Sequence, residues 1–262
     1  MTVPDDRPEK AVLLLAKSAF AAGPHAQMQR LAEMVAGFDG VAAARFAFTE
    51  QGTPSLRDGL AELVATDVPE IVILPLMVPL EPNLLAWLKR SLGRWQAASP
   101  LPWPKITISG QLGESPLLRE LLRGVLADSD RQIVVTASTF SAVEGSVVPA
   151  QKRRVLVCQG GPCNAAGAEA IWAHLRNEQR RLELRTTGEG TMTAKSTCLG
   201  PCNLAPVMQV FPEGTYYGGV TEEAIDRIIA DHLLGGRPVP EFAYEANGRK
   251  QRLRAQPLHH RG

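Results

Sequence analysis

Four cysteines in two closely spaced pairs constrain this chain more than any other feature of its sequence. Cys158 and Cys163 follow the apolar run 155–157, and Cys198 and Cys202 come later in the chain. Both pairs lie in loops rich in Gly and Pro, where glycine permits the backbone curvature that brings two thiolates toward one point. The pattern therefore predicts a site with four sulfur ligands.

Three kinds of site use four cysteines. Two disulfides suit a secreted chain, but the first residues show no basic segment followed by an apolar stretch and a cleavage site, so a reducing, cytoplasmic compartment is expected. A structural zinc ion held by four thiolates stays open, because zinc accepts such short spacings. An iron-sulfur cluster is favoured, although the plant-type ferredoxin spacing C-x4-C-x2-C does not fit.

Residues 153–241 resemble the thioredoxin-fold [2Fe-2S] ferredoxins and the [2Fe-2S] subunit of respiratory complex I. The likeness rests on the C-x4-C pair, on Cys-Leu-Gly-Pro-Cys at 198–202, on Ala-Pro-Val at 205–207 and on Phe-Pro-Glu-Gly-x-Tyr-Tyr at 211–217. It implies a thioredoxin-like fold and a [2Fe-2S] cluster bound by Cys158, Cys163, Cys198 and Cys202.

Local patterns agree with a small α/β unit in this region. Apolar and turn residues predict a strand at 154–157, a helix at 165–179 and a helix that opens at Thr221. They also predict a hairpin over 207–218.

Length and composition describe a globular protein of about two domains. The chain has 262 residues, of which 45% are hydrophobic and 21% charged. No apolar run reaches the roughly 18 residues of a membrane span, and the net charge of +1 gives no pull toward nucleic acid. We expect an α/β domain over 1–128, a linker over 129–152, a ferredoxin domain over 153–241 and a basic tail over 242–262.

Strands and helices are predicted to alternate in the first domain, which is typical of a parallel sheet. The predicted strands are 11–15, 41–48, 71–74 and 105–108, and the predicted helices are 25–35, 56–65, 84–92 and 115–126.

This order, with Leu-Pro-Leu-Met-Val at 74–78 and Gln-Leu-Gly-x-x-Pro-Leu-Leu at 111–118, resembles the short sirohydrochlorin cobaltochelatases, which are class II chelatases. The resemblance implies a chelatase-like parallel-sheet domain with functional loops at the carboxyl ends of its strands. Lys17 stands where the family has a metal-binding His, and the second such His falls at about Asn83. Because an ammonium group repels a divalent cation, the usual metal insertion is not expected from these residues.

His25, Glu81 and Glu114 lie near these loops and are candidates for a second metal site. Each also has a simpler explanation, since His25 begins a helix and both acids lie near helix N-termini, where the dipole favours them. Lys17, Glu81 and Asn83 are the candidate catalytic residues. The charge of Lys17 also suits a tetrapyrrole ligand that carries carboxylates.

Three functions are compatible with these features. The favoured one is a [2Fe-2S] electron-transfer protein with a tetrapyrrole-binding domain, serving corrinoid or tetrapyrrole metabolism. The second is an active sirohydrochlorin cobalto- or ferrochelatase with atypical ligands, and the third is a subunit of a larger redox complex. A redox partner protein is expected, and resemblance implies a homodimer. The basic tail is either a solvated end or a docking element for an acidic partner.

Overall fold

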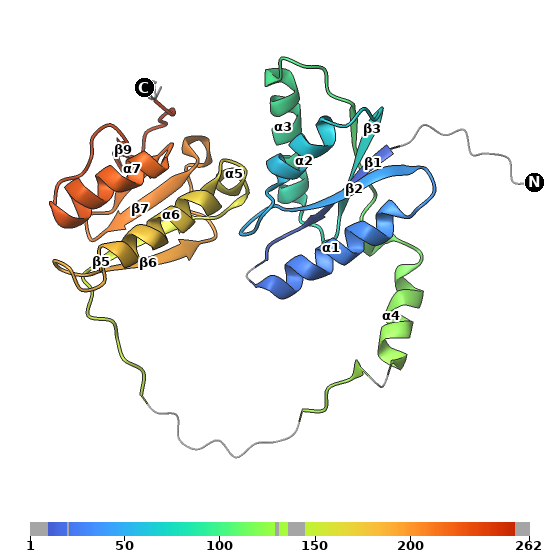
Figure 1. Cartoon of the computed structure of the whole chain (residues 1–262), viewed down its shortest axis with the longest axis horizontal. Helices are drawn as coiled ribbons and strands as arrows, with labels where there is room; N and C mark the ends of the chain where they lie inside the picture. The colour runs from blue at the N-terminus through green and yellow to red at the C-terminus, as the bar shows by residue number, and fades with distance from the viewer. Residues whose placement is uncertain (1–9, 20, 129–130, 136–144, 255–262) are drawn as a thin grey trace, which may run out of the picture.

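The computed structural model describes residues 10–19, 21–128, 131–135 and 145–254. The chain forms two sheets, each with its own helices (Figure 1). Within these ranges, none of the helices combines the length and the apolar character that crossing a membrane requires.

The first sheet is parallel and has the strand order β2-β1-β3-β4. Its strands are β1 (Lys10–Ala16), β2 (Val41–Phe48), β3 (Glu70–Pro75) and β4 (Lys105–Ile108). The helices of this part are α1 (Ala22–Ala36), α2 (Leu56–Val64), α3 (Pro82–Ala98) and α4 (Leu118–Ala127), with a short turn η1 (Leu112–Glu114) before α4. The predicted α/β class with a parallel sheet is confirmed.

Side chains of β1 alternate between two buried faces, as a continuous apolar run predicts. Leu13 and Leu15 pack in the core that contains α2 and α3 residues, whereas Val12 and Leu14 pack in the core that contains α1 residues. Because helices cover both faces, the loops at the ends of the strands are the exposed part of this sheet.

The second sheet is mixed and has the order β6-β5-β7-β8-β9. Only β5 and β6 are parallel, and the other neighbours are antiparallel. The strands are β5 (Arg153–Cys158), β6 (Thr191–Ser196), β7 (Val207–Phe211), β8 (Thr215–Gly218) and β9 (Ala243–Tyr244). The other elements are α5 (Gly161–Asn164), α6 (Ala168–Arg181), η3 (Cys202–Leu204), α7 (Glu222–Arg227) and the π-helical turn η4 (Ile228–Leu234).

One core joins the helices of this part to its sheet. Ile171 and Leu175 of α6 lie in the same buried cluster as Ile225 of α7 and Tyr217 of β8. The predicted N-cap is present, since the Thr221 hydroxyl accepts a hydrogen bond from the backbone N–H of Ala224 at 3.1 Å. The predicted strands and helices of this part are formed.

One sequence-based expectation needs correction. The tail expected from residue 242 begins inside the second sheet, because β9 pairs with β8. Beyond β9 the chain stays bonded to this part, with the backbone N–H of Arg254 donating to the Tyr244 hydroxyl at 2.9 Å. The rest of the expected tail, including His259 and His260, lies outside the described residues.

Candidate metal centre

The two cysteine pairs follow two neighbouring parallel strands. Cys158 is the last residue of β5 and lies in register with Ser196, the last residue of β6. Cys163 lies in α5, just after β5, and Cys198 and Cys202 follow β6. Since parallel strands end at the same edge of a sheet, this topology brings both pairs to one edge.

Close backbone contacts hold the two cysteine loops together. The N–H of Gln159 donates to the carbonyl oxygen of Ser196 at 2.7 Å. A Cβ atom on Gly160 would lie 2.6 Å from the carbonyl oxygen of Thr197, so only glycine fits there. Gly200 has a φ of 106°, a backbone conformation that favours glycine within the Leu199–Pro201 turn.

One cysteine pair is buried and the other is exposed. Cys158 and Cys163 are 3% and 1% exposed, whereas Cys198 and Cys202 face solvent. A hydrogen bond from the Cys163 thiol lowers the pKa of Cys158 to about 6, and the backbone N–H groups of Gly160 and Leu199 also donate to its sulfur. The same hydrogen bond, with burial, raises the pKa of Cys163. The hydrogen bonds to Cys158 thus favour the thiolate form of this side chain.

The second pair is linked in a similar way. Burial raises the pKa of Cys202, and negative charge on Cys198 and Cys158 raises it further. Cys202 also interacts with Cys163. The four cysteines therefore interact electrostatically, and hydrogen bonds join Cys158 to Cys163 and Cys198 to Cys202.

Four cysteines in two pairs can serve either a single zinc ion or a binuclear iron-sulfur cluster. Zinc needs four ligands around one point, at about 2.3 Å for sulfur. Among the described residues, the cysteines as placed do not form a group of three or more that could hold a metal ion. Two pairs of thiols match a [2Fe-2S] centre, in which four cysteines are shared between two irons.

The strand-end loops of the first sheet hold a small charged group. The Lys17 Nζ lies 3.7 Å from Oε1 of Glu81, which is the N-cap residue of α3, and Asn83 is exposed in the first turn of that helix. Glu50, which the sequence reasoning missed, is held beside them by a hydrogen bond of 2.8 Å from its N–H to the carbonyl oxygen of Lys17. Burial raises the pKa of Glu50, and the negative charge of Glu81 adds to this against the effect of Lys17.

The other predicted metal-site residues do not join this group. His25 lies on α1 and packs edge-on against Phe46, with ring centroids 4.9 Å apart. Glu114 lies in η1 and accepts a hydrogen bond from the Gln111 side chain at 3.2 Å. Among the described residues, His25, Glu81 and Glu114 are not placed as one group that could hold a metal ion.

The first cysteine loop contacts the strand-end loop after β2. The Asn164 side chain, 2% exposed, donates to the carbonyl oxygens of Phe48 and Gly52, both at 3.3 Å. The N–H of Gln51 donates to the carbonyl oxygen of Gln159 at 3.3 Å. In Figure 1, α5 lies on the side of the second part that faces the first. Across this contact, the negative charge of Glu50 acts to raise the pKa of Cys158.

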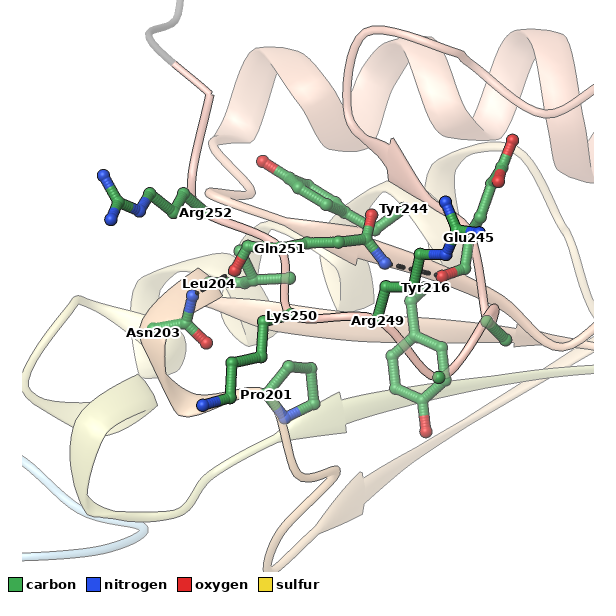
Figure 2. Close-up of a pocket in the computed structure, with 12 residues that line it drawn as sticks. Pro201, Asn203, Leu204, Tyr216, Tyr244, Glu245, Arg249, Lys250, Gln251 and Arg252 are labelled. Carbon is green, nitrogen blue, oxygen red and sulfur yellow. Dashed lines mark hydrogen bonds between the residues drawn. The ribbon is translucent and has the colours of Figure 1, made fainter.

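A basic pocket of about 620 Å³ lies beside the second cysteine loop (Figure 2). Its walls include Pro201 and Asn203, which flank Cys202, and the side chain of Tyr216. The Asn203 side chain donates to the carbonyl oxygen of Gln251 at 2.7 Å and so holds the C-terminal segment over the loop. The cations of that segment that line the pocket are Arg249, Lys250 and Arg252, against the single acid Glu245.

Two family models match the chain. The thioredoxin-like [2Fe-2S] ferredoxin model matches residues 136–233, and the CbiX model matches residues 21–129. A solved CbiX protein from Marinobacter aquaeolei is 22% identical with a TM-score of 0.38, covering 45% of this chain and 93% of that one.

Curated relatives match the second part. A Priestia megaterium protein named as a 2Fe-2S ferredoxin is 37% identical over 100 residues, or 37% of this chain and 76% of that protein. A 2Fe-2S ferredoxin of Aquifex aeolicus is 31% identical over 99 residues, or 34% and 86%. Subunit 2 of a Thermus thermophilus NADH-quinone oxidoreductase is 30% identical over 121 residues, or 46% and 65%. Through residues 136–233 the chain belongs to the thioredoxin-like [2Fe-2S] ferredoxin family, and a CbiX-type, chelatase-like domain precedes them.

Proposed function

We propose that this protein is a one-electron carrier that serves a tetrapyrrole bound by its CbiX-type domain. The proposed ligands of the [2Fe-2S] cluster are Cys158, Cys163, Cys198 and Cys202. The observation that carries the proposal is that a buried pair and an exposed pair of cysteines meet at one sheet edge, which contacts the CbiX-type domain. When bound, such a cluster takes up and releases single electrons.

The buried and exposed pairs have different roles in this proposal. Backbone N–H groups that donate to Cys158 stabilise negative charge on its sulfur, which helps to set the reduction potential. The exposed pair, Cys198 and Cys202, gives the edge at which an electron can reach a partner or a ligand.

Visible and EPR spectra of anaerobically purified protein, before and after reduction, test the cluster. We expect a coloured oxidised protein that bleaches on reduction and then gives an EPR signal. Replacing any one of the four cysteines with serine should change or abolish both spectra. A colourless protein that contains zinc would overturn the proposal.

We also propose that the CbiX-type domain binds a tetrapyrrole without inserting metal in the usual way. The positively charged ammonium group of Lys17 lies beside Glu81, where the family resemblance leads us to expect metal-binding residues. Titration of the purified protein with metal-free and metallated tetrapyrroles, followed by absorbance, tests binding. No spectral change with any of them would remove this part of the proposal.

An active cobalto- or ferrochelatase is the second candidate function. Glu50 and Glu81 favour it, because both carboxylates lie at the strand ends where an incoming cation would be held. Incubation with sirohydrochlorin and Co²⁺ or Fe²⁺ distinguishes the two functions. Formation of the metallated product, lost in a Glu50→Gln, Glu81→Gln variant, would establish the chelatase.

A subunit of a larger redox complex is the third candidate. The Thermus relative favours it, since that protein is named as a subunit of an NADH-quinone oxidoreductase. In either redox function, we propose that an acidic partner protein docks at the basic pocket next to Cys202. Purification under native conditions tests the third candidate, because stable further subunits should then remain bound.

A further inference from the structure

A groove of about 310 Å³ lies between the two parts of the chain. One wall is formed by α3 and the first turn of α2, and the other by the cysteine loops, including Cys202. The walls meet where Gly161 approaches Trp87, since a Cβ atom on Gly161 would lie 3.1 Å from that ring. The groove therefore belongs to both parts and opens directly beside an exposed cysteine.

The α3 wall of the groove is formed mainly by two tryptophans with a serine between them. Trp87, Ser91 and Trp95 are spaced four residues apart, so they share one face of the helix. Ser91 is 1% exposed, whereas both indoles are half-buried, and one edge of each packs on the core of the first sheet. A small residue between two indoles leaves a slot into which a flat ring can enter and contact aromatic surface.

Two arginines give the groove a positive charge. Arg57 and Arg94 both line it, and no Asp or Glu does so among the described residues. Within the part of the chain that the structure describes, the guanidinium of Arg94 donates one hydrogen bond, to the Ser91 hydroxyl at 3.5 Å, and that of Arg57 donates none. Guanidinium groups pair with carboxylates in a planar, two-point geometry. A ligand of this groove should therefore carry carboxylate groups that can pair with Arg57 and Arg94.

We infer that the groove binds one edge of a planar aromatic ring system that carries carboxylates, with its acids on Arg57 and Arg94 and its ring against Trp87 and Trp95. The inference rests on the proposed function and gives its tetrapyrrole a location other than the strand-end loops at Lys17. The groove volume lies at the low end for ligand sites, so the rest of a macrocycle would project outside. An occupant would lie next to Cys202, which explains the fusion of the two domains.

Uroporphyrin I, which carries carboxylates on every pyrrole ring, is the probe. Full-length, cluster-loaded protein is titrated anaerobically, and quenching of tryptophan fluorescence is followed together with the porphyrin absorbance. We expect the Arg57→Glu, Arg94→Glu variant to weaken binding at least about tenfold, because two attractions become repulsions. The control variant Arg30→Glu, Arg90→Glu, which carries the same charge change on the first part outside the groove lining, should bind as the unaltered protein does.

Further variants separate this inference from the proposed function. Loss of binding in Lys17→Gln, with the double variant binding as the unaltered protein does, would place the ligand at the strand-end loops and overturn the groove as the site. Equal affinity of the double variant and the unaltered protein would also overturn it, while the proposed function would stand. If the unaltered protein does not bind uroporphyrin I, both the groove inference and the proposed tetrapyrrole binding are rejected. If the double Glu variant misfolds, as judged from its cluster spectrum, the Arg57→Gln, Arg94→Gln variant gives the same comparison and should also bind more weakly.

Discussion

Gly160 and the carbonyl oxygen of Thr197 lie so close that a Cβ atom on residue 160 would come within 2.6 Å of that oxygen. The neighbour is backbone, which cannot rotate away as a flexible side chain would. A Gly160→Ala substitution should therefore push the two cysteine loops apart. We expect most of the cluster to be lost, measured as iron, sulfide and visible absorption per purified chain.

Gly93 is the matched control for this substitution. It lies in α3, and an added Cβ there would meet nothing within 4 Å. Gly93→Ala should keep full cluster content and should stabilise the helix by about 0.5–1 kcal/mol. Normal cluster content in Gly160→Ala would mean that the loop contact does not position the cysteines.

Asn164 should govern the contact between the two parts of the chain. Its side chain donates to the carbonyl oxygens of Phe48, at the end of β2, and of Gly52 in the loop that follows, so Asn164→Ala removes a buried and a part-buried hydrogen bond, at a cost of about 1–3 kcal/mol. We expect a larger radius of gyration in small-angle X-ray scattering. Asn177→Ala, at an exposed position of α6, should leave the radius unchanged. An unchanged radius in Asn164→Ala would show that this contact does not hold the two parts together.

Much of the fold could be predicted because its elements carry strong local patterns. The run that became β1 and the hairpin of β7 and β8 have apolar residues and turn residues at the spacing their structure needs. By contrast, β6 was missed because Thr191–Ser196 alternates polar residues at the edge of the sheet. The two residues of β9 and the four of α5 are too short for periodicity to detect.

The candidate site was only partly predictable for a different reason. The cysteines stand out because their residue type and spacing mark metal binding within a single segment. Glu50, Asn164 and Arg57 have no such signal, since each acquires its role from a neighbour more than thirty residues away in the sequence. His25 illustrates the limit of a single residue type as a signal, because the sequence could not show that its ring packs on Phe46.

Charge reversal at the basic pocket should change the rate at which small oxidants reach the reduced cluster. In Arg249→Glu, Lys250→Glu, Arg252→Glu we expect ferricyanide, an anion, to react several-fold more slowly and hexaamminecobalt(III), a cation, more quickly. Stopped-flow measurements at rising ionic strength should show both effects fade. The matched variant Arg30→Glu, Lys89→Glu, Arg119→Glu carries the same charge change on the first part. If it gives equal shifts, net charge and not the pocket is responsible.

Glu50 should lower stability at neutral pH. Burial raises its pKa above the ordinary value of 4.5, so its charged form is disfavoured in the folded protein. The cost is absent below pH 4.5 and grows as pH rises through the raised folded pKa. Glu50→Gln should therefore be more stable than the unaltered protein at pH 7, by less than about 1 kcal/mol because solvent screens this carboxyl, and equally stable near pH 4. Urea denaturation at both pH values measures this, with Glu114→Gln as the control that should show no such difference.

His232 should make the ferredoxin domain less stable in mild acid. The Tyr217 hydroxyl accepts from the N–H of Val239 at 3.2 Å and donates to Nδ1 of His232 at 2.8 Å. His232 is 0% exposed, and burial lowers its pKa below 6.5, although the Glu213 carboxylate at 3.5 Å opposes this.

Because the unfolded chain binds this proton more readily, the contribution of His232 is present above pH 6.5 and is lost as pH falls below that value. We expect the free energy of unfolding to fall between pH 7.5 and 5.5, with a slope from this residue of at most about 1.4 kcal/mol per pH unit. His232→Gln should flatten that slope even though it costs stability at pH 7.5, whereas His174→Gln, at the surface, should keep it. Urea denaturation at each pH, with the visible absorption checked for cluster loss, measures the slope. The same slope in His232→Gln and the unaltered protein would assign the acid sensitivity to another group.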